Sequence, residues 1–234
     1  MLSAIIVAAG SSRRMGFDKL FAEIDGKPVV AHTIAAFENT RAVAAIIVVA
    51  REDRHSDVEK LVREQSFKKV QAIVRGGEHR HDSVRAGLDH LREIGTQAQS
   101  AQHVAVHDAA RPLVTSEQIE RVYQVAQKHG GASLAASVSD TLKRADVDLV
   151  VSGSVHRHQL FAMQTPQIFE REILEVAYGA VLADKVTVTD EVSAVERIGG
   201  KVVLVPNEQP NFKITHPGDL QLAEFVLKER GKRS

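Results

Sequence analysis

The sequence predicts an α/β fold built on one doubly wound, mostly parallel sheet with a projecting β-arm. Two observations lead to this prediction. Short apolar runs rich in Ile, Val and Ala alternate with amphipathic stretches along most of the 234 residues, which is the pattern of successive βαβ units. The runs are apolar almost without interruption, as expected for parallel strands that helices cover on both faces. Residues 1–234 are therefore expected to form a single Rossmann-like domain.

Each element follows from its own stretch of sequence. The near-continuous apolar runs are typical of buried strands. In chain order, the predicted strands are Ala4–Ala9, Ala45–Ala50, Val70–Val74, His103–His107, Ser133–Val138 and Lys201–Val205. The stretches between them have apolar residues at helical spacing. The predicted helices are Val29–Phe37, Val58–Gln65, Asp82–Ile94, Ser116–Lys128 and His216–Arg230, and the last has Pro217 in its first turn.

The stretch from about residue 139 to 165 breaks the alternation. It has no long helical period, and its segments TLKRADVD, LVVSGSV and QLFAMQT are expected to be extended and to form an arm. Its apolar residues are Leu149, Val150, Val151, Leu160 and Phe161. On a lone arm they would face solvent, and exposed apolar surface of this extent usually marks an interface. We therefore expect a homodimer in which two arms cover each other about a two-fold axis. A surface excursion without a role is the alternative.

Composition excludes several classes of function. Lys and Arg together number 30, as do Asp and Glu, so the formal net charge is zero and a broad nucleic-acid-binding surface is not expected. The chain has no cysteine, which excludes disulfides, thiolate metal centres and thiol nucleophiles. No apolar run reaches the ~20 residues of a membrane span, and Arg13 and Arg14 follow the apolar start instead of preceding it as in an export signal. We therefore expect a cytoplasmic protein without nucleic-acid or membrane partners.

A loop rich in glycine and serine follows the first predicted strand. It reads AAGSSRRMG and is followed by Lys19. At this edge of a doubly wound sheet, backbone N–H groups around Gly10 can form a nest for phosphate oxygens. The spacing fits neither GxxxxGK[ST] nor GxGxxG, so a P-loop nucleotidase and a Rossmann dehydrogenase lose support. Arg13, Arg14 and Lys19 bring three cations to the loop, which suits a triphosphate. A solvated basic loop is the alternative.

The loop and five later motifs resemble one enzyme family. The loop, with Lys19, is similar to the signature of the sugar-phosphate nucleotidyltransferases. The later motifs are HDAARP at 107–112, DTLK at 140–143, TPQ at 165–167, TDE at 189–191 and NFKIT at 211–215. Together they resemble the 2-C-methyl-D-erythritol 4-phosphate cytidylyltransferase family of the non-mevalonate isoprenoid pathway. The ribitol-5-phosphate cytidylyltransferases share most of these motifs, and nucleotidyltransferases that act on the molybdenum cofactor share the loop, so both remain alternatives.

The resemblance implies a Mg²⁺-dependent enzyme that transfers CMP from CTP to the phosphate of 2-C-methyl-D-erythritol 4-phosphate and releases pyrophosphate by direct in-line attack. The attacking phosphate, whose second pKa is about 6, is already a dianion at neutral pH and needs no general base. Cations must therefore bring two anions together and offset charge in the transition state. The alternative is a non-catalytic nucleotide-binding module on the same fold. Such a module would not need cations on several separate segments, so their presence argues against it.

The resemblance also implies roles for particular residues. The implied catalytic residues are Arg14 and Lys19, which hold the triphosphate, and Arg157 and Lys213, which hold the acceptor phosphate. Asp108 is the implied Mg²⁺ ligand. The implied nucleotide-binding residues are Ala8, Ala9, Gly10, Gly77, Glu78 and Ser83. The other acceptor-binding residues are Thr189, which offers a hydroxyl, and Arg111 and Thr141, which are expected to reach the substrate of the dimer partner.

Four positions leave alternatives open. Asp18 stands where many relatives have proline before the lysine, and Glu78 stands where they usually have aspartate. Asp190 is a second acidic candidate, but the same residue before a helix can equally be an N-cap. Arg80 is either a phosphate ligand or an exposed residue at a helix start.

Overall fold

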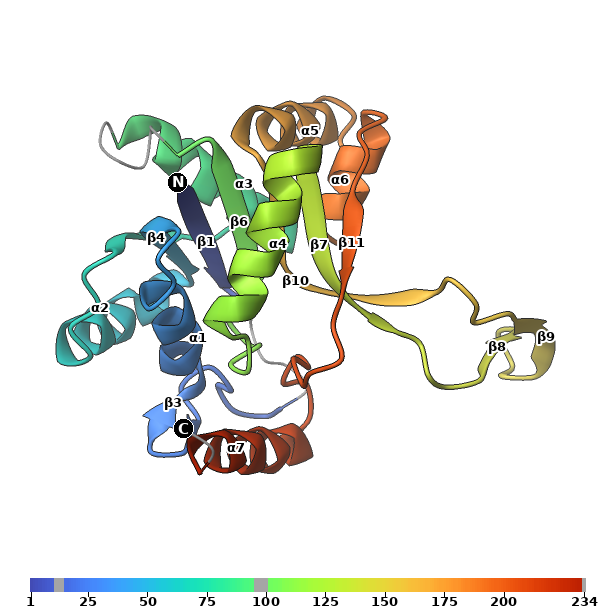
Figure 1. The fold of residues 1–234 in the computed structure, drawn as a ribbon, viewed down its shortest axis with the longest axis horizontal. Helices are drawn as coiled ribbons and strands as arrows, with labels where there is room; N and C mark the ends of the chain where they lie inside the picture. Colours follow the sequence, from blue (N-terminus) through green and yellow to red (C-terminus); the bar gives the residue numbers. More distant parts are fainter. Residues whose placement is uncertain (11–14, 95–100, 233–234) are drawn as a thin grey trace.

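The computed structural model describes residues 1–10, 15–94 and 101–232. At its centre is a seven-stranded sheet with the strand order β11-β7-β10-β6-β1-β4-β5 (Figure 1). The strands are β1 (Leu2–Ala8), β4 (Val43–Ala50), β5 (Val70–Arg75), β6 (His103–Asp108), β7 (Gly131–Ser137), β10 (Phe161–Glu170) and β11 (Val203–Pro206). Neighbouring strands are parallel except at β10, which runs antiparallel to both β6 and β7. The predicted mostly parallel α/β sheet is confirmed.

Helices cover both faces of this sheet because its strands are apolar on both sides. In β1, Ala4 and Ile6 are buried in one apolar cluster and Ile5 in another. The first cluster includes residues of α1 (Val29–Glu38), α2 (His55–Glu64), α4 (Ser116–His129) and α7 (Pro217–Gly231). The second includes residues of α3 (Arg80–Glu93), α5 (Arg171–Ala183) and α6 (Glu191–Arg197). In the part of the chain that the structure describes, no helix has both the length and the apolar character of a membrane span.

The six strands and five helices expected from the sequence all appear, with ends that differ by three residues or fewer. The segment QLFAMQT was expected to belong to the arm, but Phe161–Glu170 forms β10 and enters the middle of the sheet. Helix α5 and the short strands β2 (Glu23–Ile24) and β3 (Lys27–Pro28) were not expected at all. The reason for missing β10 lies in Thr165 and Gln167, which are polar yet buried, so this strand lacks a continuous apolar run.

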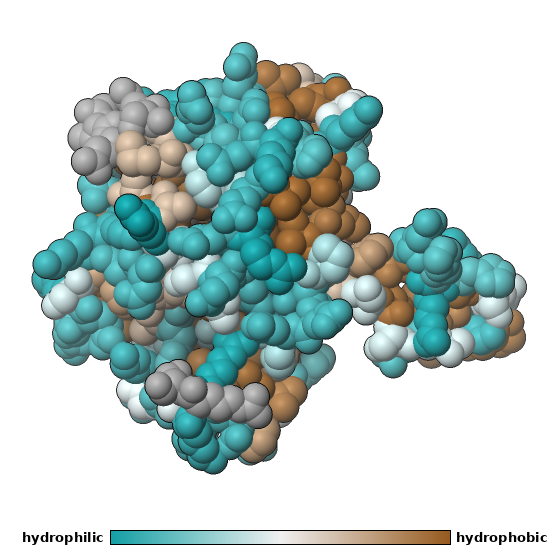
Figure 2. All heavy atoms as spheres, viewed as in Figure 1, coloured by the Kyte–Doolittle hydropathy of each residue, from teal (hydrophilic) through white to brown (hydrophobic). Residues whose placement is uncertain are grey.

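The expected arm region contains a hairpin with a sheet of its own. Strands β8 (Leu142–Ala145) and β9 (Val151–Val155) pair antiparallel, and Figure 1 shows them away from the seven-stranded sheet, beyond β10. Four apolar side chains of the hairpin have exposed fractions between 61% and 96%. They are Val147, Leu149, Val150 and Val151. Figure 2 shows hydrophobic atoms on this outlying part of the surface, which the rest of the described chain leaves uncovered.

The strand order places a topological switch point between β1 and β6. From β1 the chain passes through β4 to β5 on one side of β1 and then crosses to β6 on the other side. The loops after β1 and β6 therefore separate at the carboxyl edge of the sheet, and ligands of doubly wound sheets bind in the crevice between such loops. Gly10 lies just beyond β1, and Asp108 is the last residue of β6. The expected nucleotide loop and the expected metal ligand thus lie on the two sides of this point.

Candidate functional site

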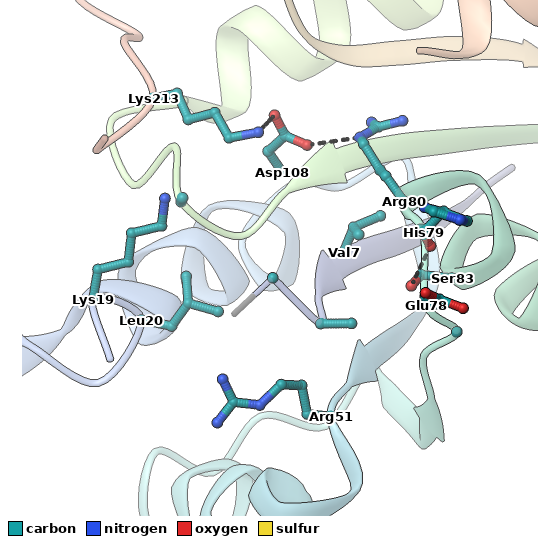
Figure 3. Close-up of a pocket in the computed structure, with 14 residues that line it drawn as sticks. Val7, Lys19, Leu20, Arg51, Glu78, His79, Arg80, Ser83, Asp108 and Lys213 are labelled. Carbon is teal, nitrogen blue, oxygen red and sulfur yellow. Dashed lines mark hydrogen bonds and ion pairs between the residues drawn. The ribbon is translucent and has the colours of Figure 1, made fainter. Parts of the chain in front are cut away.

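A cavity of 420 Å³ opens at the carboxyl edge of the sheet (Figure 3). Small-molecule sites usually enclose about 300–1,000 Å³, so this cavity can hold a nucleotide. Its lining combines the loop after β1, the β5–α3 loop and the end of β6. The expected nucleotide-binding residues that line it are Ala9, Gly10, Gly77, Glu78 and Ser83. Ala8 is buried in the apolar core at the end of β1 instead.

Two glycines allow the β5–α3 loop to pack closely, Gly76 against the loop after β1 and Gly77 against the start of α3. A Cβ atom on Gly76 would overlap the Cβ of Ala9 and lie 2.9 Å from Oγ of Ser83. A Cβ atom on Gly77 would overlap the Cβ of Asp82 in the first turn of α3. This wall of the cavity therefore requires glycine at both positions, because any side chain would clash. Such a bare backbone surface is expected where a base is to lie against the wall.

A second cavity of 360 Å³ lies beside the first. Residues of β10 line it together with Arg111 and Thr189, two of the expected acceptor-binding residues. Three residues line both cavities, namely Arg80, Asp108 and Lys213. The two cavities therefore meet at a carboxylate with a cation on each side, and we call these three residues the junction. Figure 3 shows Asp108 between the side chains of Arg80 and Lys213.

Asp108 forms ion pairs with cations from three segments. Its Oδ1 is 3.2 Å from Nε of Arg80, while its Oδ2 is 3.0 Å from Nζ of Lys213 and 3.6 Å from Nε of Arg111. Burial by itself would raise the pKa of this carboxyl group. The positive charges of the three cations outweigh burial and hold the pKa of Asp108 below its usual value. Asp108 is therefore ionised at neutral pH.

Hydrogen bonds from two sequence motifs hold the loop after β6 in place. The hydroxyl of Thr165 accepts a hydrogen bond from the N–H of Asp108 (3.1 Å) and donates one to Nδ1 of His107 (3.0 Å). Nε2 of His107 must then be the protonated nitrogen, because it lies 3.2 Å from the carbonyl oxygen of Arg111, which can only accept. Burial lowers the pKa of His107 to about 3, so its ring is neutral. The HDAARP and TPQ motifs thus position Asp108 and the backbone of Arg111.

Arg111, which was expected to reach a partner's substrate, lines the second cavity of its own chain. Its guanidinium donates from Nη1 to the carbonyl oxygen of Asn211 (2.8 Å) and from Nη2 to that of Met163 (3.3 Å). The side chain is only 12% exposed, and burial lowers its pKa. Met163, which holds Arg111 there, lies on β10, a strand whose first residues had been assigned to the arm.

Lys19 enters the first cavity from the segment after the glycine loop. Its Nζ donates a hydrogen bond of 2.7 Å to the carbonyl oxygen of Ile214, in the NFKIT motif. Asp18, which departs from the family pattern, lies 2.9 Å from Nε of Arg54 and 3.7 Å from Nη2 of Arg51. These ion pairs tie the segment that carries Lys19 to the chain between β4 and α2. The aspartate at position 18 is therefore stabilised by two neighbouring arginines, Arg51 and Arg54.

The sequence did not assign a role to three residues at or next to the cavities. Arg51 and Glu191 were not predicted, and Arg80 had two alternative roles. Arg51, directly after β4, lines the first cavity (Figure 3). It pairs with Asp53 at 2.8 Å. Arg80 lines both cavities, so it is not merely an exposed residue at a helix start. Glu191 is completely buried, and one of its oxygens lies 2.6 Å from Nη1 of Arg80. The TDE motif was the only sequence signal for Glu191, whereas Arg51 stands in an ordinary charged stretch.

Other expected site residues lie elsewhere. Thr141 and Arg157 flank the hairpin strands, are exposed, and line neither of the two cavities in this chain. Arg14 belongs to residues 11–14, outside the described residues. Asp190 lines the second cavity but also caps α6, since its Oδ1 accepts a hydrogen bond of 2.9 Å from the N–H of Ser193. The N-cap alternative for Asp190 is therefore confirmed.

The donors at the junction suit Mg²⁺ in combination with substrate phosphates. Within residues 1–10, 15–94 and 101–232, no three His, Asp or Glu side chains gather in a way that could hold a metal ion. Asp108 supplies one ionised carboxylate where the cavities meet. Mg²⁺ in nucleotide sites commonly takes about one or two carboxylates, and phosphate oxygens and water complete its octahedron. The residues therefore fit an ion that protein and nucleotide bind jointly.

Comparisons with known proteins point to one family. The family model described as 2-C-methyl-D-erythritol 4-phosphate cytidylyltransferase matches residues 2–229. A curated protein of that name from Dehalococcoides mccartyi is 39% identical, with 97% of this chain and 96% of the relative covered. Another from Halalkalibacterium halodurans is 36% identical, with 99% of each covered.

Solved structures give the same result. A crystal structure of 4-diphosphocytidyl-2C-methyl-D-erythritol synthase is similar, with a TM-score of 0.81 and 35% identity over 97% of this chain and 98% of that one. The structure of the synthase from Anaerococcus prevotii has a TM-score of 0.82 and 27% identity, with 97% of this chain and 96% of that one covered.

Proposed function

Because this chain belongs to the 2-C-methyl-D-erythritol 4-phosphate cytidylyltransferase family, we propose that it transfers the CMP unit of CTP to the phosphate of 2-C-methyl-D-erythritol 4-phosphate (MEP). An oxygen of the MEP phosphate attacks the α-phosphorus of CTP in line. The bond from that phosphorus to the bridging oxygen of the β-phosphate breaks, and pyrophosphate leaves. The product is 4-diphosphocytidyl-2-C-methyl-D-erythritol.

The observation that best supports this reaction is the pair of cavities that meet at Arg80, Asp108 and Lys213. The first cavity has the glycine-rich backbone walls that suit a nucleotide, and the second offers cations and a hydroxyl to an acceptor phosphate. A transfer between two anions requires that their phosphates come together, and fixed positive charge at the meeting point offsets their repulsion. The junction supplies this charge.

Four cations are proposed to act on the phosphates during transfer. Lys19 and Arg14 act on the triphosphate, where negative charge develops at the α-phosphorus and on the leaving pyrophosphate. Lys213 and Arg157 hold the MEP phosphate for attack. Both lysines line the first cavity, and Lys213 also lines the second, which supports their assignment to opposite sides of the reacting phosphorus. The MEP phosphate is a dianion at neutral pH, so no residue needs to remove a proton.

We propose Mg²⁺ as the cofactor, held by Asp108 and by phosphate oxygens of CTP. When bound, the ion offsets negative charge on the phosphates at the reacting centre. Asp108 also holds Lys213 and Arg80 at distances of 3.0 and 3.2 Å, so it orders the cations of the junction as well. Removal of divalent ions with EDTA is expected to abolish pyrophosphate release, and added Mg²⁺ is expected to restore it.

We propose a homodimer in which the β8–β9 hairpin of one chain completes the site of the other. Arg157 and Thr141 flank the strands of this hairpin and lie outside the cavities of their own chain. Pairing of two hairpins about a two-fold axis would cover their exposed apolar side chains and bring both residues to the partner's acceptor side. Both substrates are multiply charged anions that do not cross a bilayer unaided, so we place the reaction in the cytoplasm.

Release of pyrophosphate from CTP and MEP by the purified chain tests the proposed function. Release is expected with MEP and not with ribitol 5-phosphate at the same concentration. Replacement of CTP by UTP, ATP or GTP tests the base pocket, because the narrow loop at Gly76 and Gly77 is expected to favour cytosine over purines. Turnover with ribitol 5-phosphate alone would contradict the acceptor, and equal turnover with ATP or GTP would contradict the pyrimidine pocket.

A further inference from the structure

Glu191 is a buried carboxylate behind the junction. It is the first residue of α6 and has no solvent exposure. A buried charge is tolerated only when it is paired and hydrogen-bonded. The partner is Arg80, whose Nη1 donates to Oε1 of Glu191 at 2.6 Å and whose Nη2 donates to Oε2 at 3.0 Å. Such a two-pronged pair fixes the plane of the guanidinium as well as its position.

Glu191 is in turn held by two other elements. Tyr178 of α5 donates a hydrogen bond of 2.9 Å from its hydroxyl to Oε1. Burial, followed by the charge of Glu191, raises the pKa of Tyr178, so its hydroxyl keeps the proton that it donates. The side-chain oxygen of Gln167 on β10 accepts from the N–H of Glu191 at 3.0 Å and from that of Val192 at 3.1 Å. The TPQ and TDE motifs therefore meet at the backbone of Glu191.

This support sets the direction of Arg80. Its Nη1 and Nη2 face Glu191, and its Nε donates to Oδ1 of Asp108 at 3.2 Å. A guanidinium has five N–H donors, so these contacts, counted over the described residues, leave two for other acceptors. Glu191 and Asp108 outweigh the effect of burial and raise the pKa of Arg80, so its charge is permanent. Its side chain is 23% exposed and lines both cavities.

We propose that Glu191, supported by Tyr178, is a positioning residue for the transfer reaction. It holds Arg80 at the junction so that the remaining N–H donors bind phosphate oxygens of both substrates in the transition state. This inference rests on the proposed function and deepens it. A cation that is already oriented stabilises developing charge without reorganising during the reaction. Without Glu191, the guanidinium is expected to turn onto Asp108, its other carboxylate partner, and to compete there with Lys213.

A purely structural role for Glu191 is the alternative, because the same ion pair links α6 to α3. The chain offers a matched control in Glu175 of α5, which also bridges to a helix-α3 arginine. Its Oε1 lies 3.0 Å from Nε of Arg92 and 3.0 Å from Nε of Arg171, and it lines neither junction cavity. Glu175→Gln therefore removes a more exposed link to the same helix α3 while leaving the junction intact.

The experiment measures kcat and KM for pyrophosphate release from CTP and MEP. Glu191→Gln keeps the size of the side chain and is expected to lower kcat by about 10- to 100-fold, with KM for CTP changed by less than about threefold. Glu175→Gln is expected to keep the kcat of the unchanged chain. Tyr178→Phe removes only the supporting hydroxyl, is expected to lower kcat by about three- to tenfold, and decides the question if Glu191→Gln does not fold.

A double variant separates positioning from an independent effect. If Glu191 acts through Arg80, Glu191→Gln is expected to cost no further kcat in a chain that already carries Arg80→Ala. If Glu191→Gln lowers kcat in the Arg80→Ala chain as much as it does in the unchanged chain, the inference is wrong. It is also wrong if Glu191→Gln and Tyr178→Phe have the same kcat as Glu175→Gln. Neither result would contradict the proposed function. An unchanged chain that releases no pyrophosphate from CTP and MEP would overturn the proposed function and the inference with it.

Discussion

At the scale of single residues, Lys19 is the described cation that is proposed to bind the triphosphate. Its Nζ is fixed to the carbonyl oxygen of Ile214 at the edge of the first cavity. Lys19→Ala is expected to lower kcat by about 10²- to 10³-fold, because a donor that stabilises transition-state charge is lost. The measurement is pyrophosphate release at saturating CTP and MEP. Lys27→Ala, at an exposed position in β3, is the control and is expected to keep full activity.

His107 makes the stability of the fold depend on pH. Burial lowers its pKa to about 3 in the folded chain, while an unfolded histidine has a pKa of about 6.5. As the pH falls below about 6.5, the unfolded chain binds a proton that the folded chain does not, so the free energy of unfolding decreases until the pH approaches about 3. At pH 5 this decrease is on the order of 2 kcal/mol.

Urea unfolding at pH 7 and pH 5 tests this effect. His107→Gln removes the titration, so its free energy of unfolding is expected to fall less between the two pH values than that of the unchanged chain. His129→Gln, at an exposed position at the end of α4, is the control and is expected to retain the original pH dependence. The same fall in the His107→Gln variant and in the unchanged chain would show that His107 is not the group responsible.

At the scale of elements, the β5–α3 loop forms one wall of the first cavity, which is proposed to bind CTP. Gly76→Ala is expected to raise KM for CTP about tenfold, because the added Cβ would overlap that of Ala9 and push the two loops apart. Steady-state kinetics with CTP as the varied substrate provide the measurement. Gly179→Ala in α5 is the control, since no atom beyond the neighbouring backbone of its own helix lies within 4 Å of its added Cβ. An unchanged KM for CTP in Gly76→Ala would mean that the base does not lie against this loop.

At the scale of the whole molecule, the hairpin of one chain is expected to act at the junction of the other chain in the proposed dimer. A mixture of inactive Lys19→Ala and inactive Arg157→Ala chains is therefore expected to regain activity. One site of each mixed dimer then has Lys19 from one chain and Arg157 from the other. With random mixing the recovery is about a quarter of full activity, because half of the dimers are mixed and each has one intact site.

The control for this complementation is a mixture of Lys19→Ala with Arg111→Ala. Arg111 is held in the second cavity of its own chain by Asn211 and Met163, so both sites of this mixed dimer are damaged. No recovery is expected. Recovery in the control, or no recovery with Arg157→Ala although sedimentation shows that mixed dimers form, would contradict the shared site.

The sequence by itself determined the α/β class, six strands and five helices, and the family. Each of these follows from local information. Apolar runs mark strands that are buried on both faces, helical spacing marks the covering helices, and the motifs lie in short contiguous segments. The family resemblance, and not periodicity, assigned Ala8, Ala9, Gly10, Gly77, Glu78 and Ser83 to the nucleotide, and all of them except Ala8 line the first cavity. They come together because the carboxyl ends of parallel strands share one edge of the sheet.

Only the tertiary structure decided how distant polar residues combine. β10 was not recognisable because Thr165 and Gln167 are buried polar residues whose partners, Asp108 and Glu191, lie far away in the sequence. The inward placement of Arg111 depends on that same strand. A buried ion pair produces no local pattern in a sequence, because its two residues lie far apart along the chain and only packing brings them together. The pairing of Arg80 with Glu191, 111 residues apart, could therefore be seen only in the fold.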